Sequence, residues 1–223
     1  MPTAAELEIL ALSLKVAFAG LAASLPVAVA VAFVLARKDF PGKTLFDAAV
    51  HLPLVLPPVV VGFALLLLFG AQGPIGRVLE PLGIVFAFRW TGAALAAAIM
   101  GFPLLVRAIR LAIEAVDPRL ELAARTLGAS RTRVFFTVTL PLALPGLATG
   151  ALLGFARALG EFGATITFVS NIPGETRTLP LAIYTATQLP SGDAEALRLS
   201  VFSVLLSLGA LAFSEWMVRR RRA

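Results

Sequence analysis

Two charged residues, Arg157 and Glu161, lie four positions apart at the end of an otherwise apolar stretch. On a helix this spacing places both side chains on one face, where they can form an ion pair. Ionisable groups at membrane depth are costly and usually face a bundle interior or a watery cavity. The pair can therefore either lock its helix or mark a pore or gate. The pore and gate candidates at this place are Arg157, Gly160, Glu161, Phe162, Gly163, Thr165 and Ser170.

A second charged element, between two apolar stretches, runs from Asp117 to Ser130 and reads DPRLELAARTLGAS. Asp117 can cap a helix, and Pro118 suits its first turn. Glu121 falls near the helix N-terminus, where the dipole favours a negative charge. Gly128 permits the left-handed conformation that ends a helix. The sequence thus predicts a short capped helix, at least a solvated amphipathic one, with an apolar face formed by Leu120, Ala123, Ala124 and Leu127.

Catalytic and metal chemistry have few candidate residues in this chain. It contains no cysteine and a single histidine, His51, so it offers neither a disulfide framework nor a thiolate metal site, and we expect His51 to be structural. The phosphate-cradling pattern G-x-x-x-x-G-K-S/T does not occur. An intramembrane enzyme would need a catalytic constellation, and the serines have no evident partner base. We therefore expect no enzyme activity, no metal and no cofactor bound by this chain.

The elements that must position these residues are apolar and long. Of the 223 residues, 59% are hydrophobic and 14% are charged, whereas soluble domains carry roughly 25% charged residues. A helix needs about 20 apolar residues to cross the hydrocarbon core. Five segments approach that length, and the second and fourth are expected to extend into their flanks. They are 9–36, 52–69, 91–109, 142–159 and 197–218, which predicts an all-α integral membrane protein with one transmembrane domain over 1–223.

The basic residues predict how these crossings are oriented. If the first connection is cytoplasmic, that side holds 13 of the 19 basic residues, as the positive-inside rule requires. These are Arg37, Lys38, Lys43, Arg107, Arg110, Arg119, Arg125, Arg131, Arg133 and the terminal run Arg219–Arg222. The N-terminus is then outside and the C-terminus inside. The net charge of +6 thus comes from basic residues that are concentrated in the loops on one side of the membrane, where the terminal run can meet anionic lipid. We therefore expect no nucleic-acid partner.

Prolines interrupt the second apolar segment at Pro53, Pro57 and Pro58. Because proline removes a backbone hydrogen bond, an uninterrupted helix is not expected here. The interruption is either a kink repaired by neighbouring helices or a bend that lines a path through the bundle. After the fourth segment, the apolar pieces ATITFV and LPLAIYTA are too short to cross, and we expect them to be re-entrant or to lie along the surface.

The charged element resembles the EAA loop of ABC-importer permeases. The residues that carry this resemblance are Glu121, Ala123, Ala124, Gly128, Ala129, Leu140 and Pro141, and Leu122 stands where many members have alanine. The resemblance implies a five-transmembrane-helix type I importer core with a cytoplasmic coupling (EAA) loop at 114–133. This loop would form a coupling helix that sits in a cleft of a separate ATPase subunit. Small residues would allow close approach to that partner, and Glu121 would pair with a basic group there or cap the helix.

A narrower resemblance covers almost the whole chain. GEFGA followed by NIPGETRTLPLAIYT, together with ARKDFPGK and LPLVLPPVVVGFALLLLFG, is similar to the permeases of molybdate importers, with sulfate permeases as close relatives. This implies a bacterial-type inner (plasma) membrane, a homodimer, two cytoplasmic ATPase subunits that bind ATP and Mg, and an extracytoplasmic molybdate-binding protein. Import of sulfate, thiosulfate or tungstate stays open. A stand-alone ion-coupled carrier is the remaining alternative, although such carriers often contain internal repeats, which this sequence lacks.

Overall fold

The computed structural model describes residues 3–220, with the side chains of residue 211 and of residues 213–220 left out. The terminal basic run Arg219–Arg222, predicted to be cytoplasmic, therefore lies outside the described side chains. Within the described range the chain is helical and contains no strand. The α-helices are α1 (Ala4–Arg37), α2 (Lys43–Val55), α3 (Pro58–Phe69), α4 (Gly76–Leu79), α5 (Trp90–Glu114), α6 (Pro118–Thr126), α7 (Arg131–Val134), α8 (Leu140–Leu159), α9 (Gly163–Val169), α10 (Leu179–Thr187) and α11 (Asp193–Arg220), joined by a 3₁₀ turn, η1 (Glu80–Leu82), and a π-helical segment, η2 (Phe135–Thr139).

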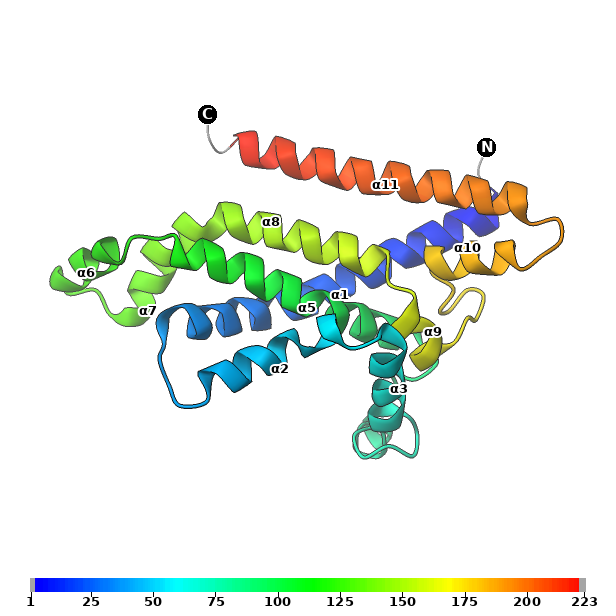
Figure 1. Ribbon diagram of the computed structural model, residues 1–223, viewed down its shortest axis with the longest axis horizontal. Coiled ribbons are helices and arrows are strands. Elements are labelled where there is room, and N and C mark those ends of the chain that lie inside the picture. Colours follow the sequence, from blue (N-terminus) through cyan, green and yellow to red (C-terminus); the bar gives the residue numbers. More distant parts are fainter. Residues whose placement is uncertain (1–2, 221–223) are drawn as a thin grey trace.

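Four long helices, α1, α5, α8 and α11, run along the long axis of the molecule (Figure 1). The short helices α6 and α7 lie at one end, and α9 and α10 lie toward the other, near the N-terminus. Three continuous helical stretches of the described chain are long and apolar enough to cross a membrane, namely 4–37, 90–114 and 131–159. The pair α2 and α3 makes a fourth if it is counted as one span. The fifth predicted crossing lies on α11, which does not meet this measure within the described residues.

The predicted bend is a complete break. α2 and α3 meet at an angle of 109°. Leu56 and Pro57 have extended ψ angles of 141° and 132°, because a residue before proline is pushed out of the helical region and proline itself cannot donate to the helix ladder. Pro53 was expected to contribute, but it lies inside α2, which continues to Val55.

The core lies where α5 packs between α1 and α8. Small residues make this packing close: an added Cβ at Gly20 of α1 would lie 2.8 Å from the Ala94 carbonyl oxygen of α5. On α8, the glycines at 146, 150 and 154 are spaced four apart, and all three face α5. This is the small-xxx-small pattern that lets membrane helices approach one another. At the end of this core nearer α6, Leu35 of α1 and Ile109 and Ile113 of α5 are fully buried.

Candidate functional site

The charged element forms the short capped helix that the sequence predicts. α6 begins at Pro118, and the carboxylate of Asp117 accepts a hydrogen bond of 2.9 Å from the Arg119 backbone N–H. The helix ends before Gly128, whose φ of +86° is left-handed. An added Cβ at Gly128 would meet nothing within 4 Å in this chain. The backbone conformation, and not a lack of space within the chain, thus favours glycine here.

α6 presents two different faces. Pro118, Glu121, Leu122 and Arg125 line a groove toward α1 and α8. The predicted apolar face lies elsewhere on the helix: Leu127 is 89% exposed, Leu120 is 49% exposed, Ala123 is exposed, and Ala124 is half-buried, as is Ala129 beyond the helix end. α6 therefore carries an exposed apolar surface, at the tip of the molecule (Figure 1).

Glu121 is bound within its own chain, a contact that the sequence did not predict. Its Oε1 accepts hydrogen bonds from Arg37 at 2.9 and 3.2 Å and from the Thr139 hydroxyl at 2.9 Å. Arg37 also donates to the Val116 carbonyl oxygen at 3.0 Å. One carboxylate thus joins α6 to the end of α1 and to the residue that precedes α8. We call Arg37, Glu121 and Thr139 the clamp.

The predicted Leu-Pro pair lies where the π-helical segment becomes α8. Leu140 donates its N–H to the carbonyl of Phe135, five residues back, and Pro141 follows without an N–H to donate. π-helical turns occur mostly as short bulges and often at functional sites. The helical stretch that contains α8 begins at Arg131, eleven residues before the predicted span, so the expected extension into the flank is confirmed.

The ion pair predicted from the four-residue spacing is present. Arg157 and Glu161 lie 2.6 Å apart, with Glu161 buried and Arg157 partly exposed. The second carboxylate oxygen of Glu161 accepts a 2.8 Å hydrogen bond from the Ala164 N–H. Glu161 therefore fastens the end of α8, at Gly160, to the start of α9. In this chain, the interpretation in which the pair locks its helix has direct geometric support.

The bend and the predicted gate segment pack on each other. An added Cβ at Gly163 would lie 2.8 Å from the Pro58 Cβ, and one at Gly62 would lie 2.4 Å from the Ala164 carbonyl oxygen. The Phe162 ring lies 5.1 Å from that of Tyr184 on α10. Of the predicted hydroxyls, that of Thr165 is buried, whereas Ser170 is exposed at a positive φ of 63°.

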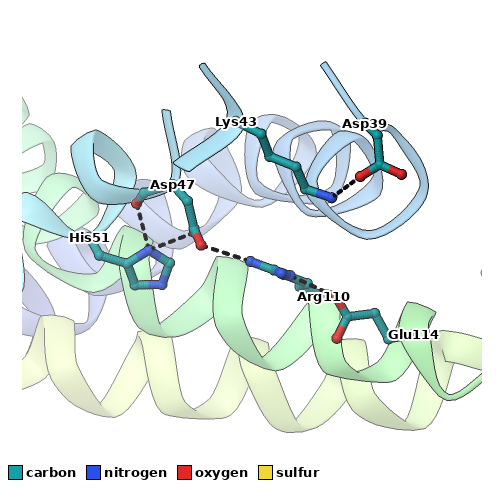
Figure 2. Close-up of polar contacts among 6 residues, drawn as sticks. All are labelled: Asp39, Lys43, Asp47, His51, Arg110 and Glu114. Atoms are coloured by element: carbon teal, nitrogen blue, oxygen red, sulfur yellow. Dashed lines mark hydrogen bonds and ion pairs between the residues drawn. The ribbon is translucent and has the colours of Figure 1, made fainter. Parts of the chain in front are cut away.

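A polar network holds the first arm of the bent pair against α5 (Figure 2). Arg110 on α5 donates to Asp47 on α2 at 2.9 Å and to Glu114 at 2.7 Å. The His51 Nδ1 lies 2.9 Å from the Asp47 carbonyl oxygen and 3.1 Å from its carboxylate. As expected, His51 has a structural setting. The described residues contain no group of three or more acidic or histidine side chains that could hold a metal ion.

Comparison with known proteins identifies the family. Residues 15–223 match the model of the binding-protein-dependent transport system inner membrane component. The chain belongs to this family. It is 59% identical over 97% of its length to the molybdenum transport system permease protein ModB of Escherichia coli (strain K12), covering 95% of that protein. The sulfate transport system permease protein CysT of Salmonella typhimurium is more distant, at 39% identity over 78% of this chain and 64% of that protein.

A solved structure shows the same fold. A chain in the crystal structure of a bacterial ABC transporter that imports alginate aligns with a TM-score of 0.77 at 17% identity, over 98% of this chain and 80% of that one. The predicted fold class of this permease is confirmed. It is a membrane-embedded transport component and, as predicted, not itself an enzyme.

Sequence reasoning missed the partner of one predicted site residue of this permease, Glu121, and the pairing of Asp47 with Arg110. Arg37 had been assigned only to the inner charge bias, yet it is the main partner of Glu121, 84 residues away. The Asp47–Arg110 pair joins helices 63 residues apart. No spacing rule finds such pairs. The glycine spacing on α8 was a local signal that the sequence did offer.

Proposed function

We propose that this permease is the membrane-spanning subunit of an ATP-driven molybdate importer in a bacterial inner (plasma) membrane. It works as a homodimer with two cytoplasmic ATPase subunits, which bind ATP and Mg, and with an extracytoplasmic molybdate-binding protein. The near full-length similarity to the molybdenum permease supports the substrate. Sulfate, thiosulfate and tungstate are the alternatives, because the sulfate permease is also similar.

The observation that carries the coupling role is the outward face of α6. Leu120, Ala123 and Leu127 are exposed at the molecule's tip, and burying such a surface favours association with a partner. The glycine turn at Gly128 and the half-buried Ala124 add no bulk that would hold a partner away. Since the chain lacks a phosphate-binding loop, the docked partner must supply ATP hydrolysis.

The orientation that follows puts α6 and the C-terminus in the cytoplasm and the N-terminus outside. The basic residues around α6 and at the first connection support it. α9 and α10 lie toward the opposite end from α6 (Figure 1), where the binding protein would deliver the anion. The bend and the α8–α9 junction then form the gate, where Gly163 packs so closely on Pro58 that an added Cβ would lie 2.8 Å from the Pro58 Cβ.

Reconstituted transport tests the function. The permease, its ATPase and its binding protein are placed in proteoliposomes, and ATP hydrolysis and uptake are measured with molybdate, tungstate and sulfate. We expect molybdate to stimulate both. Stimulation by sulfate alone would replace the substrate but keep the mechanism, whereas uptake without the ATPase would favour an ion-coupled carrier and refute the proposal.

Docking is tested separately, because the chain contains no cysteine and a single one can be introduced. Leu127→Cys should be labelled by a membrane-impermeant reagent only from the cytoplasmic side, and the ATPase should protect it. Val78→Cys is a matched control, being 67% exposed on the predicted outer side. Labelling of both positions from the same side would overturn the orientation.

A further inference from the structure

A groove of about 1110 Å³ lies between α1, α8 and the inner face of α6. Its apolar lining includes Val29 and Phe33 of α1 and Leu144 and Leu147 of α8. Phe33 packs edge-on against Phe135 of the π-helical segment, with ring centroids 4.9 Å apart. The groove therefore has an apolar wall that belongs to two membrane-crossing helical stretches.

The end of the groove next to α6 is basic. Four basic residues and one acidic residue line it. Arg37 is paired with Glu121 in the clamp, whereas Lys38, Arg125 and Arg131 form no ion pair among the described residues. An anion at this end would meet three uncompensated positive charges, while the rest of the groove would exclude it. The occupant must therefore be amphipathic.

The depth of the groove in the membrane further limits which molecules could bind in it. Arg37 is the last residue of α1, and Lys38 follows it, so in the proposed orientation the basic end lies at the cytoplasmic headgroups. Basic pockets between transmembrane helices on that side bind anionic lipid headgroups. The groove-lining side chains of α6 are Pro118, Glu121, Leu122 and Arg125, which are distinct from its proposed ATPase face.

We propose that this groove binds an anionic phospholipid of the inner leaflet. Its headgroup lies among Lys38, Arg125 and Arg131, and its acyl chain lies along Val29 and Leu144. The lipid also contacts α6 beside the clamp, so it steadies the coupling helix against α1 and α8. This inference rests on the proposed function for its orientation, although lipid binding is measured without any transport substrate.

Lipid retention tests the site directly. The complete transporter is taken from vesicles of phosphatidylcholine with and without phosphatidylglycerol, and the lipids that remain bound are counted by native mass spectrometry. Arg131→Gln should weaken phosphatidylglycerol retention about fivefold, the effect of losing one cation near a headgroup. Arg133→Gln is the matched control: it is exposed on the same short helix but does not line the groove, and we expect no change.

A steric variant tests the same site in case the remaining basic residues compensate for the loss of one charge. Ala30 is exposed and lines the groove, so Ala30→Trp should fill it and release the lipid, whereas Ala22→Trp, exposed on the same helix but outside the groove, should not. Equal retention of phosphatidylcholine and phosphatidylglycerol would refute the site. So would a disulfide-linked dimer of the Ala30→Cys variant, because a second copy would then cover the groove.

The two proposals fail in different ways. If wild-type vesicles import molybdate but retention is insensitive to Ala30→Trp and Arg131→Gln, only the lipid site is wrong. If the lipid is retained selectively but neither uptake nor ATP hydrolysis responds to an oxyanion, the transport function is wrong and the site stands.

Discussion

Breaking the clamp should uncouple ATP hydrolysis from transport. In Arg37→Gln, Glu121 loses two charge-assisted hydrogen bonds, and the Val116 carbonyl loses a third from the same guanidinium. The two side chains are 16% and 20% exposed, so the pair lies between an exposed pair worth about 0–1 kcal/mol and a buried one whose disruption costs about 3–5 kcal/mol. We therefore expect Arg37→Gln to lower the free energy of unfolding by ~2 kcal/mol.

A double-mutant cycle measures the interaction itself. Arg37→Gln, Glu121→Gln and the double variant are compared by thermal unfolding of the purified transporter, where ~2 kcal/mol corresponds to about 4–8 °C for a chain of this size. The two single losses should add to more than the loss of the double variant, by ~1–2 kcal/mol. Arg119→Gln is the control, since Arg119 is exposed on α6 and forms no ion pair among the described residues.

The functional readout is the number of ATP molecules hydrolysed per molybdate imported. Both single variants break the Arg37–Glu121 bonds that join α6 to α1. α6 can then follow the ATPase while α1 stays behind, so this ratio should rise in both single variants and stay unchanged in Arg119→Gln. Strictly additive stability losses, or a ratio equal to that of the wild type, would refute the reasoning.

Three further predictions concern the turn, the bend and the α2 arm. At Gly128, where a left-handed φ costs residues with a Cβ about 1–2 kcal/mol, Asn should retain uptake better than Val; equal losses would assign the position to partner contact. Gly62→Ala should lower the free energy of unfolding by about 1–3 kcal/mol, because the added Cβ would lie 2.4 Å from the α9 backbone. Gly209→Ala is the control and should cause no loss, because nothing lies within 4 Å of its added Cβ. Asp47→Asn and Arg110→Gln should each cost ~0.5–1 kcal/mol in the same assay, since the pair is partly exposed, and additive losses would argue against a direct interaction.

Local patterns predicted the elements that depend on neighbouring residues. The α6 helix follows from Asp117, Pro118 and Gly128, each of which acts within one turn of its own position. The break before α3 follows from two adjacent prolines, Pro57 and Pro58, which leave no donor for a continued helix. Pro53 shows the limit of this reasoning, because a single proline near a helix end removes only one hydrogen bond and α2 continues past it.

Contacts between distant segments could not be predicted from one sequence. The partner of Glu121 is chosen by how α1 packs on α5, and nothing in the spacing of Arg37 and Glu121 records that packing. The same holds for Gly62 and Gly163, whose small size indicated close approach but not to which helix. Assigning a role to the gate candidates and to the groove thus requires tertiary geometry, whereas the α6 helix can be predicted from local sequence.

The geometry around α6 argues that it cannot move alone. Only residues 115–117 separate it from α5, the clamp ties it to α1, and Thr139 joins it to the helical stretch of α8. A displacement imposed on its exposed face therefore acts on three membrane-embedded helices at once. Glu161 in turn joins α8 to α9. α9 packs on α3, the second arm of the bent pair, at Gly62 and Gly163, where the two backbones lie close together. Because tightly packed interiors transmit strain, we expect motion of α6 to reach the bend through these contacts, beginning at the partly exposed clamp.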